Sequence, residues 1–212
     1  RQTQIHLAPD GRISMTRSSD DDRSRLDLWI YDPASDTLDR LLDARDLPST
    51  AGRMTDAEKA EKERRRAFTH GVTSYRWFPD GDRVLIVADG NAFVLSAADS
   101  ATELVTPAGT RQTQIHLAPD GSHISFVRDG DLFFTNISGR EKRLTSDASD
   151  TVSSGLPDFI AQEEMHRFDG HWWSLDSNFI AYTRVDTSSI PVTHRYEIDA
   201  ENFNVVEQRY PY

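Results

Sequence analysis

One short motif recurs along the chain and constrains the fold more than any other feature. It reads APDGRISMT from Ala8, FPDGDRVLIV from Phe78, APDGSHISFV from Ala118 and, in degraded form, SLDSNFIAYT from Ser174. In each copy a Pro-Asp-Gly type turn leads directly into a short run of alternating or continuous apolar residues, which is typical of a tight turn entering a β-strand. The chain is therefore predicted to consist of repeated units of short strands.

The spacing of the motif indicates which repeat architecture this is. Pro79 and Pro119 stand 40 residues apart, close to the roughly 40 to 50 residues of a four-stranded propeller blade. Residues 123–145 predict a strand, an Asp129-Gly130 turn, a strand, a turn at Gly139 and a strand. We therefore expect an all-β fold, a partial β-propeller of about three to four blades of four-stranded antiparallel sheet.

The other intervals between motif copies are longer, so two units carry insertions. Seventy residues separate Pro9 from Pro79, and 56 separate Pro119 from Leu175. We place a helical insertion at about 45–71 and a second insertion at about 146–170, within a chain that is otherwise all propeller.

Composition narrows the classes of partner. Twenty-four Lys and Arg face 35 Asp and Glu, a net charge of −11, which argues against nucleic acid or an anionic membrane and favours cationic ligands. The chain has no cysteine, and no apolar run approaches the roughly 18 to 20 residues of a membrane span. It opens at Arg1 without Met or a signal peptide. We expect it to be a piece of a longer protein.

The segment RQTQIHLAPDG occurs twice, at 1–11 and 111–121, letter for letter. The units around the two copies have diverged much further, so the identity has a separate cause. A recent duplication or an artefact would each produce it. We favour the artefact and assign the copies no function.

The first insertion is predicted to be a helix. Thr55 and Glu58 form a capping-box pair, followed by strong helix formers. Small and apolar side chains form one stripe of this helix, namely Ala57, Ala60, Ala67 and Phe68. Arg64 falls on that stripe and is expected to face the protein, whereas Arg66 lies about 200° further round and is expected at the surface.

The second insertion contains two adjacent carboxylates, Glu163 and Glu164, in the stretch IAQEEMHRFDGHWW. Residues 158–168 predict one or two helical turns with Asp158 as N-cap. By itself the pair is weak evidence of a site, because adjacent acidic residues are common on solvated helix faces.

A metal site is the alternative chemistry for this segment, since His166 and His171 stand close to the glutamates. No HExxH or comparable ligand pattern occurs, so we expect no metal and no cofactor. His6 and His116 sit at strand entries and are expected to be structural. Trp172 and Trp173 are expected in the core.

The string FIAQEEMHRFDGHWWS, followed by FIAYTRVD, SSIPVTHRYEI and VVEQRYP, closely resembles the dipeptidyl peptidase IV subfamily (S9B) of the prolyl oligopeptidase family, including its bacterial and dipeptidyl peptidase 8/9-like members. The resemblance implies an N-terminal eight-bladed propeller that caps a C-terminal α/β-hydrolase domain, with release of N-terminal Xaa-Pro or Xaa-Ala dipeptides. It also implies that the whole protein is a homodimer.

The resemblance assigns roles to particular residues. Glu163 and Glu164 match the paired glutamates that bind the free α-amino group of a peptide substrate. The stretch KERRR at 62–66 resembles an inserted helix whose arginine holds substrate oxygens, and the choice between Arg64 and Arg66 stays open. The chain contains no G-x-S-x-G elbow and no Ser, Asp, His set in hydrolase order, so this piece alone is expected to be inactive.

Two other functions stay open. One is a non-catalytic propeller that binds a partner protein, and the other is a metal-dependent hydrolase that uses His166, His171 and the glutamates. The sequence does not fix the compartment, although a periplasmic or cell-envelope location is favoured over a cytoplasmic one.

Overall fold

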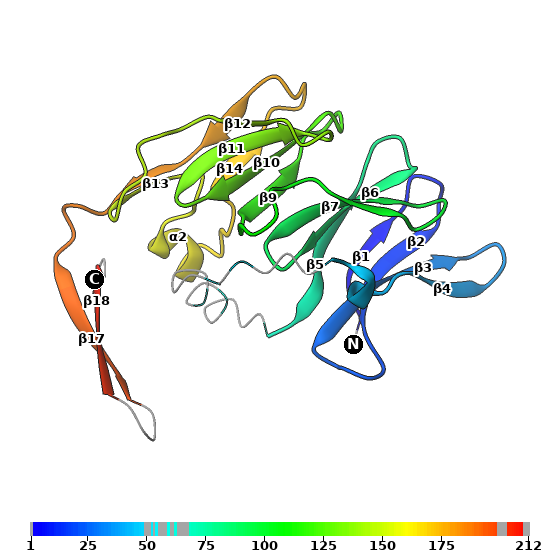
Figure 1. Ribbon diagram of the computed structural model, residues 1–212, viewed down its shortest axis with the longest axis horizontal. Helices are drawn as coiled ribbons and strands as arrows, with labels where there is room; N and C mark the ends of the chain where they lie inside the picture. Colours follow the sequence, from blue (N-terminus) through cyan, green and yellow to red (C-terminus); the bar gives the residue numbers. More distant parts are fainter. Residues whose placement is uncertain are drawn as a thin grey trace.

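The computed structural model describes residues 2–48, 52, 54, 59, 62, 68–198 and 203–209. Over these residues the chain forms a row of small antiparallel sheets laid side by side, followed by a projecting hairpin (Figure 1). This arrangement confirms the predicted all-β partial propeller. In the described part of the chain, no helix is long and apolar enough to cross a bilayer.

The first two blades form one eight-stranded sheet. The first blade contains β1 (Gln2–Leu7), β2 (Ile13–Ser18), β3 (Arg25–Asp32) and β4 (Thr37–Leu42), and the 3-10 helix η1 (Ala44–Asp46) follows. The second contains β5 (His70–Trp77), β6 (Arg83–Ala88), β7 (Asn91–Ser96) and β8 (Thr102–Leu104). Within each blade, successive strands pair antiparallel. A short parallel contact between β3 and β5 joins the two blades.

The third blade is a separate four-stranded sheet, and the fourth consists of two strand pairs. The third contains β9 (Thr113–Leu117), β10 (His123–Arg128), β11 (Asp131–Asn136) and β12 (Glu141–Arg143). In the fourth, β14 (His171–Trp173) pairs with β15 (Ile180–Tyr182), and β13 (Val152–Ser154) pairs with β16 (Arg184–Asp186). The strands and turns predicted at 123–145 are confirmed, because Asp129 and Gly130 take left-handed φ values of 51° and 80° between β10 and β11.

The last element is a hairpin of β17 (Val192–Ile198) and β18 (Phe203–Arg209). It projects from the row of blades (Figure 1). Several of its apolar side chains are exposed, among them Tyr196, Ile198 and Phe203.

The repeated motif forms a closed turn in all four copies, and this turn is one residue shorter in the first copy than in the other three. The residue before each Pro, or before Leu175, donates its N–H across the turn, in the pairs Ala8 to Arg12, Phe78 to Arg83, Ala118 to His123 and Ser174 to Phe179, at 2.7 to 2.9 Å. In the first three copies the glycine takes a positive φ, which it tolerates because it has no Cβ. The degraded fourth copy keeps the turn, since Ser177 adopts φ 59° at the glycine position.

Consecutive turns also contact one another. A Cβ added to Gly81 would lie 3.2 Å from Pro9, and one added to Gly121 would lie 3.0 Å from Pro79. Between the third and the fourth turn, the Asp120 N–H donates to Ser177 Oγ at 3.1 Å. The repeated turns therefore pack against each other from blade to blade.

The core lies between the blades and follows the period of a β-strand. In β6 and β7, Val84, Ile86 and Phe93 pack into a cluster with Leu28 of the first blade. The alternate residues, including Leu85 and Val94, pack into a second cluster with Phe78 and Ile124. Successive side chains point to opposite faces of a sheet, so the second blade is covered on both faces.

A hydrogen-bonded serine joins the first blade to the second, and the third to the fourth. Ser14 Oγ accepts from the Trp77 indole at 2.9 Å and from the Tyr75 hydroxyl at 3.1 Å. Ser125 Oγ accepts from the Trp173 indole at 2.8 Å and lies 2.8 Å from His171 Nε2. His171 thus occupies in the fourth blade the position that Tyr75 occupies in the second.

The two identical segments take equivalent places in the first and third blades. Each forms the strand that precedes a repeated turn, and Gln4 and Gln114 share a left-handed φ of 51° and 52°. The His6 ring packs edge-on against Tyr75, and the His116 ring stacks on His171. Whatever the origin of the identity, both copies form the same strand of their blades, with different neighbours.

Most of the first insertion lies outside the described residues, including the Thr55–Glu58 cap, Arg64 and Arg66. The residues that follow this insertion, at the start of β5, are bonded to and packed against β3 and the turn before it. The His70 N–H donates to the Ser24 carbonyl at 3.0 Å, and a Cβ on Gly71 would lie 2.6 Å from the Leu26 carbonyl.

Candidate functional site

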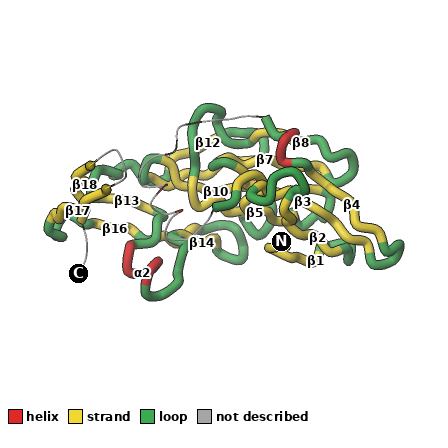
Figure 2. Tube along the Cα trace, turned by 90° about the horizontal axis from the view of Figure 1, so that it is seen from below, coloured by secondary structure: helices red, strands yellow, loops and turns green. Residues whose placement is uncertain are grey.

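The second insertion contains the short helix α2 (Phe159–Glu163), as predicted. Asp158 is its N-cap, and its carboxylate accepts from the Ala161 N–H at 2.7 Å. Ala161 and Gln162 are buried, and Gln162 Nε2 donates to the Pro157 carbonyl at 3.2 Å. The buried side of α2 thus fixes the helix. Figure 2 shows α2 on one side of the layer of strands.

The two predicted glutamates lie at the C-terminal end of α2. Glu163 is its last residue, and Glu164 is its C-cap, whose N–H donates to the Ile160 carbonyl at 2.9 Å. His166 then adopts a left-handed φ of 50°, and the Arg167 N–H returns to the Ala161 carbonyl at 2.9 Å. The structure therefore presents both carboxylates on the exposed end of a fixed helix.

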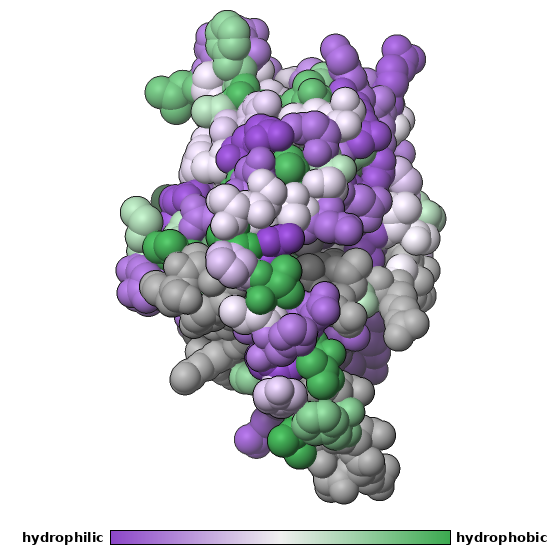
Figure 3. Space-filling model, turned by 90° about the vertical axis from the view of Figure 1, so that its left-hand side faces the viewer, coloured by the Kyte–Doolittle hydropathy of each residue, from purple (hydrophilic) through white to green (hydrophobic). Residues whose placement is uncertain are grey.

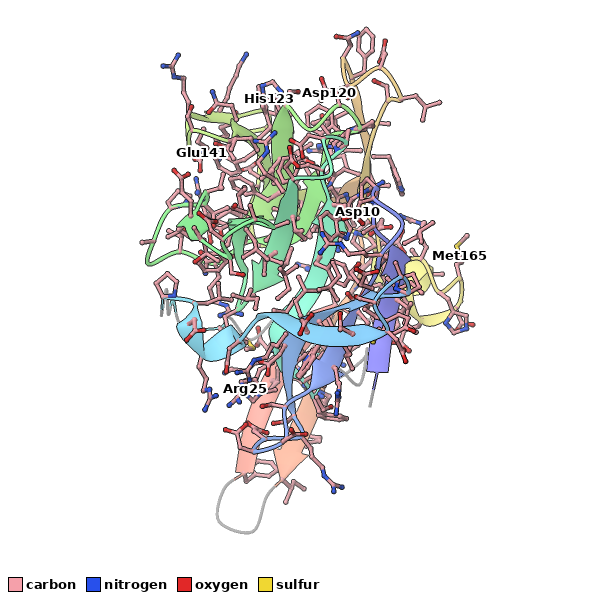
Figure 4. The ribbon with its side chains drawn as sticks, turned by 90° about the vertical axis from the view of Figure 1, so that its right-hand side faces the viewer. Asp10, Arg25, Asp120, His123, Glu141 and Met165 are labelled. Carbon is pink, nitrogen blue, oxygen red and sulfur yellow. The ribbon has the colours of Figure 1, made fainter. Side chains whose placement is uncertain are left out.

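We call residues 156–169 the acidic loop. Its outer end projects from the sheets, as the labelled Met165 shows (Figure 4). Arg167 ties the loop together, because it donates to the Asp169 carbonyl at 2.8 Å and lies 3.7 Å from the Asp158 carboxylate. Its guanidinium also stands 5.8 Å from the centroid of the Trp172 ring.

A cavity of about 490 Å³ lies beside the base of this loop. It is lined by the strands that begin the first three blades, through residues such as Gln4, Thr73 and Gln114, and by both insertions, through Lys62 and Asp169. Lys62 belongs to the predicted stretch KERRR. Neither Glu163 nor Glu164 is among the described residues that line the cavity.

Asp169 connects the cavity to a stacked pair of histidines, of which His171 is buried and His116 is half-buried. Its carboxylate lies 3.4 Å from His116 Nε2, and the His116 and His171 rings stack at 4.5 Å between centroids. Burial lowers the pKa of His116, although the Asp169 carboxylate opposes this effect. Burial also lowers the pKa of His171, to about 4, and neighbouring His116 adds to the shift. Both rings are therefore neutral at pH 7.

The alternative metal site does not assemble around the predicted histidines. His166 is exposed at the end of the helix, whereas His171 is fully buried. Both ring nitrogens of His171 already have neighbours, Gly155 O at 3.3 Å and Ser125 Oγ at 2.8 Å. Across the residues with assigned positions, no group of three or more His, Cys, Asp or Glu could hold a metal ion.

The prediction for the tryptophan pair was half wrong. Trp173 is half-buried and bonded to Ser125, but Trp172 is 41% exposed. The two side chains point to opposite faces of β14 because they are adjacent in a strand, and only one of those faces meets the third blade.

The sequence did not single out the residues that hold the acidic loop. Gln114 and Thr183 bond to its two ends, and neither belongs to a recognisable motif. The one available signal was that Gln114 lies in the duplicated segment, which we assigned no function.

Comparison with known proteins places this fold and loop in a family. The model of the family described as dipeptidyl peptidase IV N-terminal region matches residues 100–212, more than half of the chain. The solved dipeptidyl peptidase 4 of Porphyromonas gingivalis aligns with a TM-score of 0.67 at 20% identity. That alignment covers 98% of this chain and 28% of the other, and it supports the fold.

The curated relatives align with a smaller part of this chain than the solved structure does, and their names are similar to its title. A Penicillium rubens protein named "Probable dipeptidyl-aminopeptidase B" is 28% identical over 128 residues, which make up 53% of this chain and 14% of the relative. A protein of the same name from Ajellomyces capsulatus is 28% identical over 157 residues, 70% of this chain and 15% of the relative. The chain thus spans about one seventh of the length of these relatives. On the family match, supported by the fold, this chain belongs to the dipeptidyl peptidase IV N-terminal region family.

Proposed function

We propose that this chain is the part of a serine exopeptidase that binds the free N-terminus of a peptide substrate and helps to gate its entry. The full-length protein would release Xaa-Pro or Xaa-Ala dipeptides, with the catalytic triad in an α/β-hydrolase domain of the same polypeptide. The observation that carries the proposal is the position of Glu163 and Glu164. They stand together at the exposed end of a helix whose other side is buried.

The chemistry of an N-terminus suits such a pair. A peptide α-ammonium has a pKa of about 7.7 to 8.0, so it is mostly cationic near neutral pH and offers three donors to carboxylate oxygens. Two adjacent carboxylates repel each other, and a bound cation relieves that repulsion. The net charge of −11 attracts the same cation from a distance and disfavours nucleic acid.

A fixed clamp for the N-terminus also explains the release of dipeptides. If the ammonium is held at a set distance from a serine nucleophile, only the bond after the second residue reaches the point of attack. The rigidity of α2 matters for this reason, because a clamp that moved would not measure length.

We propose Arg64, with Arg66 as the alternative, as the group that holds a substrate backbone oxygen between clamp and nucleophile. The position of Lys62 supports a role for this stretch, since Lys62 lines a cavity together with Asp169 of the acidic loop. On a regular helix Arg66, four residues after Lys62, would share the face of Lys62, which favours the alternative. The two insertions therefore share one hollow.

We further propose that the full-length protein is a homodimer. The projecting β17–β18 hairpin supports this, because it exposes apolar side chains such as Tyr196 and Phe203 away from the blades. If the hairpin contributes to the contact, Tyr196→Asp should shift the full-length protein toward monomer in light scattering.

The clamp is tested by removing each carboxylate in the full-length protein. Glu163→Ala and Glu164→Ala should each cost about 2 to 5 kcal/mol of transition-state binding, a loss of roughly 30-fold or more in kcat/KM for an Xaa-Pro substrate. Glu103→Ala is the matched control, because Glu103 is an exposed glutamate on β8 of the second blade. Wild-type turnover by both clamp variants would exclude the proposed role.

Acetylation of the substrate N-terminus tests the same contact by changing the substrate instead of the protein. An N-acetylated Xaa-Pro substrate lacks the ammonium, so its kcat/KM should fall far below that of the free form. Equal rates for the two substrates would exclude the clamp, whereas no turnover of either substrate would favour the alternative, in which a non-catalytic propeller binds a partner protein.

A further inference from the structure

The acidic loop begins and ends at the same point in the structure. A Cβ added to Gly170 would overlap the backbone of Gly155 and Leu156, so the two ends of the loop are in direct contact. The loop is thus an Ω-loop, a compact excursion with closed ends.

Thr183 bonds to both ends at once. Its hydroxyl donates to the Leu156 carbonyl at 2.7 Å and lies 3.1 Å from the Gly170 carbonyl. Its backbone makes the same bridge, since its N–H donates to the Gly170 carbonyl at 2.8 Å and its carbonyl accepts from the Gly155 N–H at 2.9 Å. One residue between β15 and β16 therefore closes the loop.

Gln114 fixes the closed loop to the third blade. Its Nε2 donates to the Phe168 carbonyl at 2.7 Å, and its Oε1 accepts from the Gly170 N–H at 3.3 Å. The nitrogen and the oxygen of one side-chain amide thus bond to the backbone of residues 168 and 170. These two bonds set the direction in which the chain leaves the acidic loop. The left-handed backbone of Gln114, with φ 52°, orients the side chain for this contact.

We infer that Gln114 and Thr183 are positioning residues for the acidic pair. This inference rests on the proposed function of Glu163 and Glu164. The loop is joined to the blades at its base, while the glutamates lie at the end of its helix, so a small rotation at the base displaces both carboxylates. Displacement of a binding group by about 1 Å can reduce a rate by roughly 100-fold.

The test uses Gln114→Met and Thr183→Val in the full-length protein. Both replacements approximately keep side-chain size and remove the side-chain hydrogen bonds, while the backbone bonds of Thr183 remain. Each should raise KM and lower kcat/KM for a free Xaa-Pro substrate by roughly 10-fold to 100-fold, while the ratio of free to N-acetylated turnover falls. Thr183→Ser keeps the hydroxyl and should restore wild-type values.

Thr106→Val is the control for the loss of a hydrogen-bonded threonine hydroxyl. The Thr106 hydroxyl donates to Asn91 and accepts from the Ala92 N–H within the second blade, away from the loop. Its loss should lower stability without changing KM. A KM shift in this control as large as that in Thr183→Val would overturn the inference.

A double-mutant cycle separates positioning from general folding. In a Glu163→Gln/Glu164→Gln background the carboxylates are absent, so adding Gln114→Met should cause no further loss of kcat/KM. The same loss in both backgrounds, or wild-type kinetics for Gln114→Met and Thr183→Val, would overturn the inference while leaving the clamp intact. If instead Glu163→Gln/Glu164→Gln itself turns over substrate like the wild type, the proposed function fails.

Discussion

At the scale of single residues, the exchange of a tyrosine for a histidine changes how two blades respond to pH. Tyr75 and His171 hold equivalent positions beside Ser14 and Ser125. A ring nitrogen facing the Gly155 carbonyl must carry a proton, so Nδ1 of His171 donates and Nε2 accepts from the serine hydroxyl. This network requires a neutral imidazole.

Acid should therefore weaken the joint between the third and fourth blades. The pKa of His171 falls from 6.5 to about 4 on folding, so the unfolded chain binds the extra proton between these values. The stabilisation is complete above pH 6.5 and is lost as pH falls toward 4, by up to about 3 kcal/mol. His171→Tyr, which copies the second blade, should flatten this dependence. Thermal unfolding of the full-length wild type and of His171→Tyr at pH 5 and pH 7.5 checks this prediction. If Tm falls by the same amount between the two pH values in both proteins, the prediction is wrong.

At the scale of elements, the repeated turn is a unit of packing as well as a chain reversal. Gly121 has a positive φ of 75°, and an added Cβ would meet Pro79 of the preceding turn at 3.0 Å and Phe78 at 3.1 Å. Gly11, in the identical copy, has a positive φ of 90° with nothing within 4 Å. The two glycines share a local sequence and differ in their neighbours.

This difference gives a matched pair of substitutions. Gly11→Ala should cost about 1 kcal/mol of stability from backbone strain alone, and Gly121→Ala about 2 to 3 kcal/mol, because the methyl group also pushes against the neighbouring turn. Urea unfolding of the full-length variants measures both. Equal midpoints would show that contact between turns contributes little.

The elements that could be predicted from the sequence are those that depend on residues close together in the chain. The turns, β10 to β12 and the Asp158 cap of α2 each depend on residues a few positions apart, and the sequence predicted all of them. The contact of Gln114 with Phe168 joins positions 54 residues apart, so no local pattern contains it. The exposure of Trp172 was missed because its environment depends on which blade face is covered.

At the scale of the whole molecule, the described blades differ in how well their faces are covered. The second blade has clusters of buried side chains on both sides. In the first and fourth blades, apolar residues remain exposed, such as Leu7 on β1 and Tyr182 on β15. Figure 3 shows apolar side chains scattered among polar ones on the side of the molecule that carries the projecting hairpin.

Exposed apolar strand faces favour association. The 212-residue chain, expressed alone, should therefore form oligomers that grow with concentration and should bind the dye ANS more strongly per mole than the full-length protein. Light scattering over a concentration series checks this. A monodisperse monomer without dye binding would contradict it.

The closed base of the acidic loop has one more consequence. Since Thr183 joins the point where the loop leaves to the point where it returns, the spacing of β13 and β14 does not depend on what lies between them. A segment of different length and chemistry could be grafted at 157–167 if Phe168 and Asp169, which contact Gln114 and His116 of the third blade, are kept. Under the proposed function, exchange of this one segment would change which ligand the protein binds.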